Sequence, residues 1–174
     1  HILIPTLEKV GNRFEKGEIF LPQLIQSAGA AQAGFEEIRK AMTRSSQSEV
    51  NLSKGKIILA TVKGDIHDIG KNIVKVVLEN SGYQIIDLGK DVPIEVVRQT
   101  VLRENAKLVG LSALMTTTVK NMEETIRDLK NHSECKIMVG GAVLTKDYAL
   151  SIGADYFAKD AKAAMDIAKK VFEE

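Results

Sequence analysis

The sequence has no tryptophan, a single cysteine and only three prolines among its 174 residues. One cysteine excludes an intramolecular disulfide framework, so we expect a reducing, cytoplasmic setting in which Cys135 is a core thiol. No apolar run is long enough to cross a membrane, and no signal-peptide pattern is present. The formal net charge of +1 gives no reason to expect nucleic acid or an anionic membrane as a partner.

Hydrophobic residues make up 44% of the chain and charged residues 27%, which is typical of a soluble globular protein with a core. The length suits one domain of ordinary size with a smaller appendage. Because the chain begins at His1 in the middle of an apolar pattern, we expect it to be a piece of a longer protein.

Residues 1–43 carry two apolar stripes at helical spacing, separated near Gly17. The first stripe consists of Leu3, Leu7, Val10 and Phe14, and the second of Leu24, Ala28, Ala31, Phe35, Ile38 and Met42. Two helices alone cannot bury both stripes, so we expect further helices or another surface to cover them. The polar, serine-containing segment 44–54 is predicted to be a linker before a second domain at 55–174.

After the linker, strand and helix patterns alternate five times. We predict strands at 56–62, 84–88, 107–111, 136–139 and 155–157. We predict helices at 70–81, 93–105, 119–131, 145–152 and 161–172. The strands are continuously apolar, as in a parallel sheet covered on both faces. Right-handed connections then give a flavodoxin-like, doubly wound α/β sheet in the order 2-1-3-4-5.

Three short motifs stand where predicted strands one, three and four end: Asp65-Ile66-His67-Asp68-Ile69-Gly70, Ser112-Ala113-Leu114 and Gly140-Gly141. In the predicted order these strands are neighbours, so the motifs converge on one edge of the sheet, where open α/β folds bind ligands. A neutral imidazole such as that of His67 is a good ligand for a transition metal, and Asp65 is placed to hold it.

Each motif also has a simpler explanation. Asp65 could cap the following helix, and Thr118 is a natural N-cap for the next one. Ser112 could be an ordinary turn hydroxyl, and Gly140-Gly141 an ordinary strand-to-helix turn. A hydrolytic zinc centre is disfavoured because His1 and His132 have no ligand-like spacing to His67. No nucleotide-binding motif follows the first strand.

Taken in order and at these separations, Asp-x-His-x-x-Gly, Ser-x-Leu and Gly-Gly resemble the cobalamin-binding signature of methionine synthase and related corrinoid methyltransferases. The resemblance implies bound cobalamin, as methylcobalamin, with His67 replacing the cofactor's benzimidazole on cobalt. It implies that Asp65 holds His67 and that Thr118, where the family often has Ser, continues the hydrogen-bond relay. His67 is therefore the expected metal ligand, and Asp65 and Thr118 are the expected catalytic relay.

The resemblance also implies contacts with the cofactor. Ser112 and Thr116 match positions that touch its buried nucleotide tail, and Gly140 and Gly141 match a place where that tail leaves no room for side chains. The other expected contacts are Gly64, Ile66, Asp68, Ile69, Gly70, Leu114 and Ala161. In the family, a four-helix bundle covers the methyl-bearing face of cobalt, and residues 1–43 would supply its last two helices. The matching cap residues, which could also simply pack the helical pair, are Phe14, Phe20, Leu21 and Leu24.

We therefore predict a methyl carrier that cycles between methyl-Co(III) and Co(I) and that works with separate donor and acceptor domains or subunits. The main interpretation is methionine synthase, with methyltetrahydrofolate as donor and homocysteine as acceptor. The alternative is a stand-alone corrinoid protein for methanol, methylamine or methoxyl donors. The helical pair argues against an adenosylcobalamin mutase. The lack of tryptophan and of a DNA-binding domain argues against a cobalamin light sensor.

Overall fold

The computed structural model describes residues 53–173 and, in the N-terminal region, residues 6, 9–11, 13–14, 16–20, 22–27, 29–30 and 33–34. Helix is present on both sides of a turn at 16–19. At that turn Gly17 N–H donates to Phe14 O (3.0 Å) and Glu18 N–H donates to Arg13 O (2.9 Å). This bonding pattern ends a helix at a glycine with positive φ, here 71°. The predicted break at Gly17 is confirmed, while most of the predicted linker lies outside the described residues.

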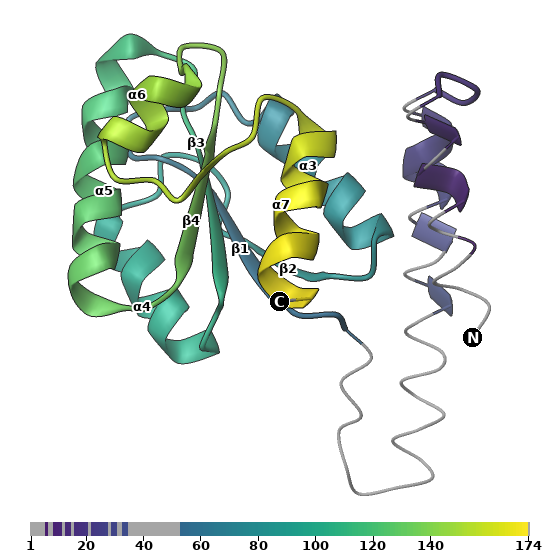
Figure 1. Cartoon of the computed structure of the whole chain (residues 1–174), viewed down its shortest axis with the longest axis horizontal. Coiled ribbons are helices and arrows are strands. Elements are labelled where there is room, and N and C mark those ends of the chain that lie inside the picture. The colour runs from purple at the N-terminus through teal and green to yellow at the C-terminus, as the bar shows by residue number, and fades with distance from the viewer. Residues whose placement is uncertain are drawn as a thin grey trace, which may run out of the picture.

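Five parallel strands form the sheet of the second region (Figure 1): β1 (Lys56–Thr61), β2 (Gln84–Asp87), β3 (Leu108–Ser112), β4 (Lys136–Gly140) and β5 (Tyr156–Phe157). Their order is β2-β1-β3-β4-β5, and every neighbouring pair is parallel. The predicted flavodoxin-like order is confirmed. Each strand bound agrees with the sequence prediction to within one residue.

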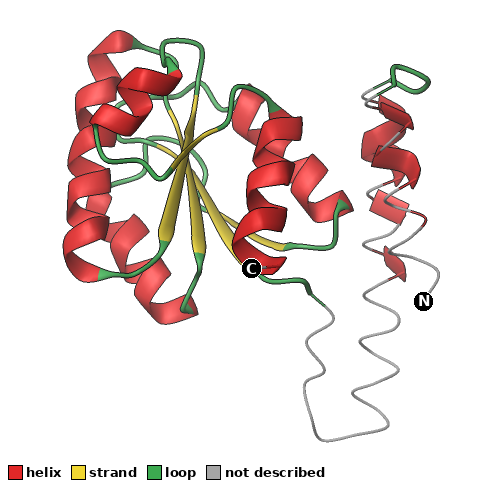
Figure 2. Cartoon of the chain, viewed as in Figure 1, coloured by secondary structure: helices red, strands yellow, loops and turns green. Residues whose placement is uncertain are grey.

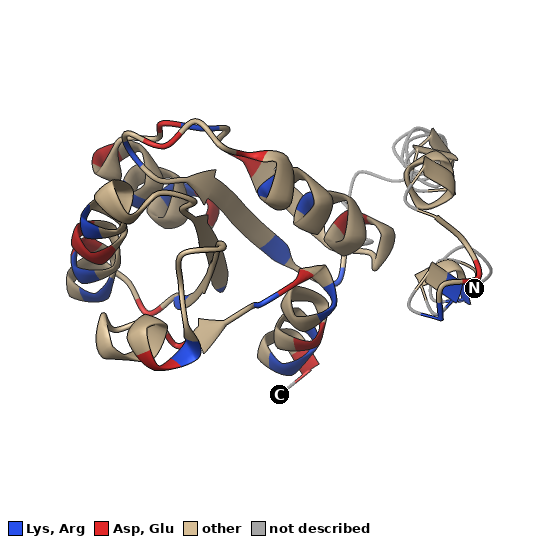
Figure 3. Ribbon diagram, turned by 90° about the horizontal axis from the view of Figure 1, so that it is seen from above, with Lys and Arg blue, Asp and Glu red and all other residues tan. Residues whose placement is uncertain are grey.

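The helices are α3 (Ile69–Asn80), α4 (Ile94–Glu104), α5 (Val119–His132), α6 (Lys146–Ser151) and α7 (Ala161–Glu173), with a short 3-10 turn, η1 (Thr116–Thr118), before α5. They lie on both sides of the sheet (Figure 2), with α4, α5 and α6 on one side and α3 and α7 on the other. Lys and Arg residues are interspersed with Asp and Glu residues along these outer helices (Figure 3). Among the described residues, no helix combines the length and apolar character needed to span a membrane.

Alternating strand residues build two separate hydrophobic cores. On the α4–α6 side the buried strand residues are Ile58, Ala60, Val109, Leu111, Ile137 and Val139, joined by Val62 just after β1. On the α3–α7 side they are Ile57, Leu59, Leu108 and Met138, packed with Leu78, Ala164 and Ala168. The second core ends at small residues toward the carboxyl ends of the strands, among them Gly110 and Gly140. Small residues at this edge leave space between the sheet and helices α3 and α7.

Candidate functional site

The three sequence motifs meet at one edge of the sheet, as predicted. Thr61 and Ser112 are register partners at the ends of β1 and β3, and Ser112 and Gly140 are partners at the ends of β3 and β4. Backbone hydrogen bonds extend this pairing into the loops, because Val62 N–H donates to Ser112 O and Ala113 N–H donates to Gly140 O. The sheet register therefore fixes the spacing between the Asp-x-His loop, the Ser-x-Leu loop and the glycine pair.

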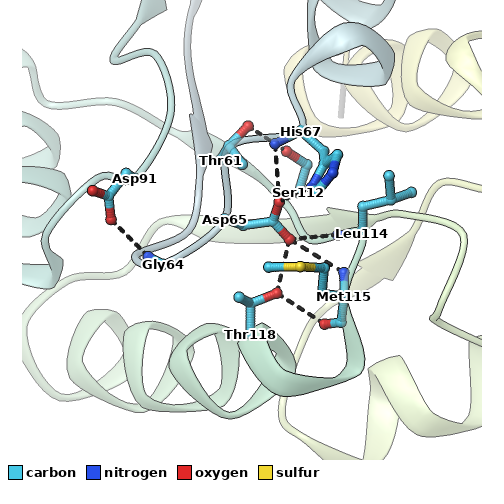
Figure 4. Close-up of polar contacts among 9 residues, drawn as sticks. All are labelled: Thr61, Gly64, Asp65, His67, Asp91, Ser112, Leu114, Met115 and Thr118. Atoms are coloured by element: carbon cyan, nitrogen blue, oxygen red, sulfur yellow. Dashed lines mark hydrogen bonds and ion pairs between the residues drawn. The ribbon is translucent and has the colours of Figure 1, made fainter.

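The carboxylate of Asp65 is fully buried and accepts five hydrogen bonds (Figure 4). Its Oδ1 lies 3.0 Å from the backbone nitrogen of His67 and 2.9 Å from His67 Nδ1. Its Oδ2 lies 2.7 Å from Leu114 N, 3.3 Å from Met115 N and 2.8 Å from Thr118 Oγ1. Burial alone would raise the pKa of Asp65, but the hydrogen bonds from the His67 and Leu114 amides and from the Thr118 and His67 side chains lower it overall. Asp65 is therefore ionised at neutral pH.

An ionised carboxylate only accepts hydrogen bonds, so the Asp65 contact places a proton on His67 Nδ1 and leaves the lone pair on Nε2. The His67 side chain is 45% exposed, whereas that of Asp65 is completely covered. A buried anchor and an exposed ring are the arrangement needed to present Nε2 to a metal from outside the protein.

The helix-capping roles considered for Asp65 and Thr118 do not describe the contacts that their side chains make. The N-cap of α3 is Asp68, which makes no side-chain cap bond, and Asp65 bonds to other loops instead. The Thr118 hydroxyl makes no cap bond to α5 but lies 2.8 Å from both Asp65 Oδ2 and Met115 O. The structure thus brings His67, Asp65 and Thr118 into the chain of contacts expected from the sequence.

A cavity of about 700 Å³ lies between the strand ends and helices α3 and α7. It extends from the exposed loop at His67 to the buried side chains of Leu59 and Met138. The expected site residues that line it are Ile66, His67, Asp68, Ile69, Gly70, Ser112, Leu114, Gly140, Gly141 and Ala161. Ile66, Ile69 and Leu114 are large apolar residues that remain exposed beside His67, up to 78% for Ile69. The site therefore combines an apolar surface around the ring with a deep cavity next to it.

The remaining expected site residues are placed differently. Gly64, Asp65 and Thr118 support the loop but do not line the cavity, and Thr116 is exposed in η1 and does not line it either. Of the expected cap residues, Leu24 is buried, Phe14 is half-buried and Phe20 is 72% exposed, while Leu21 lies outside the described residues. None of the three described cap residues belongs to the cavity lining.

The glycines at the site have two different explanations. A Cβ on Gly141, where φ is 139°, would lie 1.8 Å from Ala113 O, and one on Gly140 would lie 3.0 Å from Ala158 O. Glycine was expected at both positions because a ligand tail would leave no room for side chains. At Gly141, however, contacts within the protein already exclude a side chain. At Gly70, by contrast, no atom lies within 4 Å of an added Cβ. The protein leaves that space open beside His67.

Two polar residues near the cavity are placed in a way that the sequence did not predict: Thr61 was assigned only to a strand, and Lys71 was expected to face solvent or to pair with a nearby charge. The Thr61 hydroxyl is buried and lies 2.8 Å from Ser112 Oγ. The Lys71 side chain is only 2% exposed and its Nζ contacts Asp87 Oδ1 at 2.5 Å and Asn72 Oδ1 at 2.8 Å. Thr61 could have been found as the register partner of Ser112. The burial of Lys71 has no signal in the local sequence, because its partner Asp87 comes from β2.

The described residues include no group of three or more His, Cys, Asp or Glu side chains able to hold a bare metal ion. His67 Nε2 is a single exposed nitrogen donor, and such a donor suits a metal that already carries other ligands, as the metal of a macrocycle does. The exposed apolar side chains of Ile66, Ile69 and Leu114, which lie beside His67, suit contact with the flat surface of such a macrocycle. The cavity next to them suits a long group attached to the macrocycle. The residues present thus fit cobalamin.

Comparisons with known families agree with this chemistry. A family model described as B12 binding domain matches residues 55–168, and a second model with the same description matches residues 1–39. Dimethylamine corrinoid protein 3 of Methanosarcina mazei is 40% identical over 168 residues, covering 95% of this chain and 99% of the relative. Trimethylamine corrinoid protein 1 of the same organism is 40% identical, covering 95% of this chain and 76% of the relative.

Solved structures give the same result. A cobalamin-binding protein from Desulfitobacterium hafniense DCB-2 matches with a TM-score of 0.71 and 35% identity, over 94% of this chain and 77% of that chain. The methanol:cobalamin methyltransferase complex MtaBC from Methanosarcina barkeri matches with a TM-score of 0.88 and 31% identity, over 98% of this chain and 65% of that chain. The chain therefore belongs to the B12-binding domain family and is a homologue of the Methanosarcina corrinoid proteins.

Proposed function

We propose that this chain is the corrinoid protein of a methyltransferase system for methylamines or methanol, and that it carries a methyl group on cobalamin between two partner proteins. The observation that carries the proposal is the contact of buried, ionised Asp65 with His67 Nδ1 at 2.9 Å, which leaves Nε2 free at the mouth of the cavity. The relatives are named for dimethylamine, trimethylamine and methanol systems. These names favour the stand-alone corrinoid protein over methionine synthase, which the sequence analysis preferred.

When bound, cobalamin supplies a cobalt atom that can accept and release a methyl group. His67 would ligate it through Nε2, and Asp65 keeps the imidazole in the required tautomer and orientation. Asp65 also stabilises positive charge on the ring when both nitrogens carry protons. Thr118 donates to Asp65 and so stabilises the carboxylate in every state of the ring.

The cavity would hold the nucleotide tail of the cofactor. Ser112, Gly140, Gly141 and Ala161 line it, and its buried end is apolar. The exposed side chains of Ile66, Ile69 and Leu114 would then meet the lower surface of the corrin ring, which removes their apolar area from water. Gly70 would allow the ring to approach the backbone, since the protein places nothing there.

We further propose the division into a helical cap at 1–43, a linker at 44–54 and a cobalamin-binding domain at 55–174. Separate family-model matches to residues 1–39 and 55–168 support two units. Phe14, Phe20, Leu21 and Leu24 would shield the methyl-bearing face, and the exposed side chain of Phe20 is available for such a contact.

The methyl donor can be tested with the reduced, cobalamin-loaded protein. It is mixed in parallel with methanol-, monomethylamine-, dimethylamine- and trimethylamine-specific methyltransferases and their substrates, or with a methyltetrahydrofolate-binding domain and its substrate. We expect one of the methylamine or methanol systems to produce the methyl-cobalt absorbance spectrum. Methylation from methyltetrahydrofolate alone would contradict the proposal and restore the methionine synthase interpretation.

A further inference from the structure

The turn immediately before the relay is held from two sides. Gly64 N–H donates to Asp91 Oδ1 at 2.7 Å (Figure 4), and Asn121 Nδ2 donates to Lys63 O at 2.7 Å. Asp91 N–H also donates to the backbone oxygen of Asp65 at 2.9 Å. Asp91 lies between β2 and α4, whereas Asn121 lies in the first turn of α5. Two segments far apart in the sequence therefore hold the N–H and the C=O of the single peptide group that joins Lys63 to Gly64.

The backbone at this turn allows few alternatives. Gly64 has a φ of 82°, and a Cβ there would lie 3.3 Å from Asn121 Nδ2. Asp91 has a φ of 54°, a left-handed conformation that is uncommon outside glycine and that Asp tolerates better than most residues. Helix α4 begins at Ile94 with Pro93 as its N-cap, so the Asp91 carboxylate is not used to cap it. Its carboxylate instead accepts a hydrogen bond from Gly64 N–H, in the turn before His67.

Beyond Asp65, His67 is exposed, and it is anchored to Asp65 through its backbone N–H and its Nδ1. The orientation of the imidazole therefore depends on the Lys63–Gly64 turn that precedes Asp65. We propose that Asp91 and Asn121 are positioning residues that fix the Lys63–Gly64 turn, so that Asp65 and His67 are oriented for cobalt before the cofactor binds. This inference rests on the proposed function, because it takes His67 to be the metal ligand. Preorganisation of this kind raises affinity by removing the ordering cost from the binding step.

The test is a double-mutant cycle on cobalamin binding by the full chain. Asp91→Ala removes the acceptor for Gly64 N–H, and we expect it to raise the Kd for methylcobalamin about tenfold, equal to about 1.4 kcal/mol. The same change in a His67→Gly background should leave the Kd unchanged, because that variant has no imidazole whose orientation Asp91 could set. Asp91→Asn keeps an acceptor oxygen and the left-handed backbone, so it should restore most of the lost affinity.

Asn121→Ala provides a second route if Asp91→Ala does not fold, and it should show the same dependence on His67. Asp166→Ala, an exposed position on α7, is the matched control and should not change the Kd in either background. An equal rise in Kd with and without His67 would mean that Asp91 and Asn121 shape the cavity, and it would overturn the inference. No rise in either variant would overturn it too. An identical cofactor spectrum in wild type and His67→Gly would instead reject the ligand assignment itself, and the inference with it.

Discussion

Asp65 shows how one residue can define the chemistry of this site. It has no exposed surface, yet it remains ionised because two loops and one side-chain hydroxyl donate to it. A buried carboxylate without such donors would take up a proton instead. The same hydrogen bonds that keep it charged also set its distance from His67, so charge and orientation cannot be changed independently.

This arrangement predicts a pH-dependent contribution to stability. The pKa of Asp65 is lower in the folded protein than its unfolded value of about 4, so its stabilising effect is complete above that value and is lost as the pH falls toward the folded pKa. We expect cofactor-free Asp65→Asn to be about 2 kcal/mol less stable than wild type at pH 7, with a smaller difference below pH 4. Urea unfolding at several pH values measures both quantities. A difference that does not change with pH would contradict the explanation, and Asp147→Asn serves as an exposed control.

Gly70 and Gly141 are expected to respond differently to substitution by alanine. Gly70→Ala places a methyl group where no protein atom lies, in the first turn of α3, so the cofactor-free protein should keep its stability or gain up to about 1 kcal/mol. Its affinity for cobalamin should fall, because the methyl group occupies the space reserved for the corrin. Gly141→Ala should instead cost about 3 kcal/mol or more without any cofactor, owing to the clash with Ala113 O. Unfolding and binding titrations on both variants separate the two roles, and unchanged cobalamin affinity in Gly70→Ala would refute the first.

The contact between His67 and Asp65 was predictable because both stand in the Asp-x-His-x-x-Gly motif, whereas the contact of Thr118 was expected only from the family resemblance. The sequence did not reveal the Leu114 and Met115 amides that hold Asp65, because the direction of a backbone N–H depends on a loop conformation that no local pattern encodes. Asp91 was also missed. Its loop follows β2, which is the neighbour of β1, so the predicted strand order already placed it at the correct edge.

At the scale of elements, an ion pair joins the start of α3 to the end of β2. Burial tends to raise the pKa of Asp87, but its contacts with Lys71, Gly89 and Lys75 lower it overall. Lys71 is almost fully buried, whereas Lys75 is one-third exposed and lies 3.4 Å from the same carboxylate. The buried lysine is therefore the partner on which Asp87 depends.

We predict unequal effects from removing these two charges. Lys71→Met leaves Asp87 with a distant, exposed partner and should destabilise the protein by about 3 kcal/mol. Lys75→Met removes a solvent-screened pair and should cost less than about 1 kcal/mol. Chemical denaturation of the cofactor-free variants gives both values. Equal effects would mean that the buried pair contributes no more than the exposed one.

The elements themselves were predictable, because apolar runs and helical periodicity marked every strand and helix of the second region. Strand β5, with only two residues, was still found because Tyr156 and Phe157 lie between two helical patterns. What the sequence left open was the cavity. Its volume depends on how Gly110, Ala158 and Ala164 from separate elements face one another, and such packing of small residues leaves no periodic signal.

In the whole molecule, the proposed cap would cover the methyl-bearing face of the cofactor, and the sheet domain would cover the opposite face. Among the described residues, the sheet domain has two cores that are formed by positions 57–172. We therefore predict that a protein lacking residues 1–43 folds and binds methylcobalamin, but that light cleaves its cobalt–carbon bond faster than in the full chain. Photolysis followed by absorbance provides the comparison. Equal rates in the two proteins would show that residues 1–43 do not shield the methyl group.

The relatives are named for dimethylamine and methanol systems, whereas the residues proposed to lie beneath the corrin would serve any methyl donor. The choice between methionine synthase and a stand-alone corrinoid protein could not be made from His67, Asp65 and Thr118, because the roles proposed for these residues concern the cobalt and not the methyl donor.

If His67 replaces the benzimidazole of cobalamin on cobalt, the absorbance spectrum of the bound cofactor must report the change of ligand. We predict that methylcobalamin bound to wild type shows an imidazole-ligated spectrum, and that His67→Gly still binds the cofactor but gives the spectrum of cobalt without a nitrogen ligand below. Added imidazole should restore the first spectrum in the variant, because the Asp65 carboxylate remains to hold it. Identical spectra for wild type and His67→Gly, with no response to imidazole, would contradict the account.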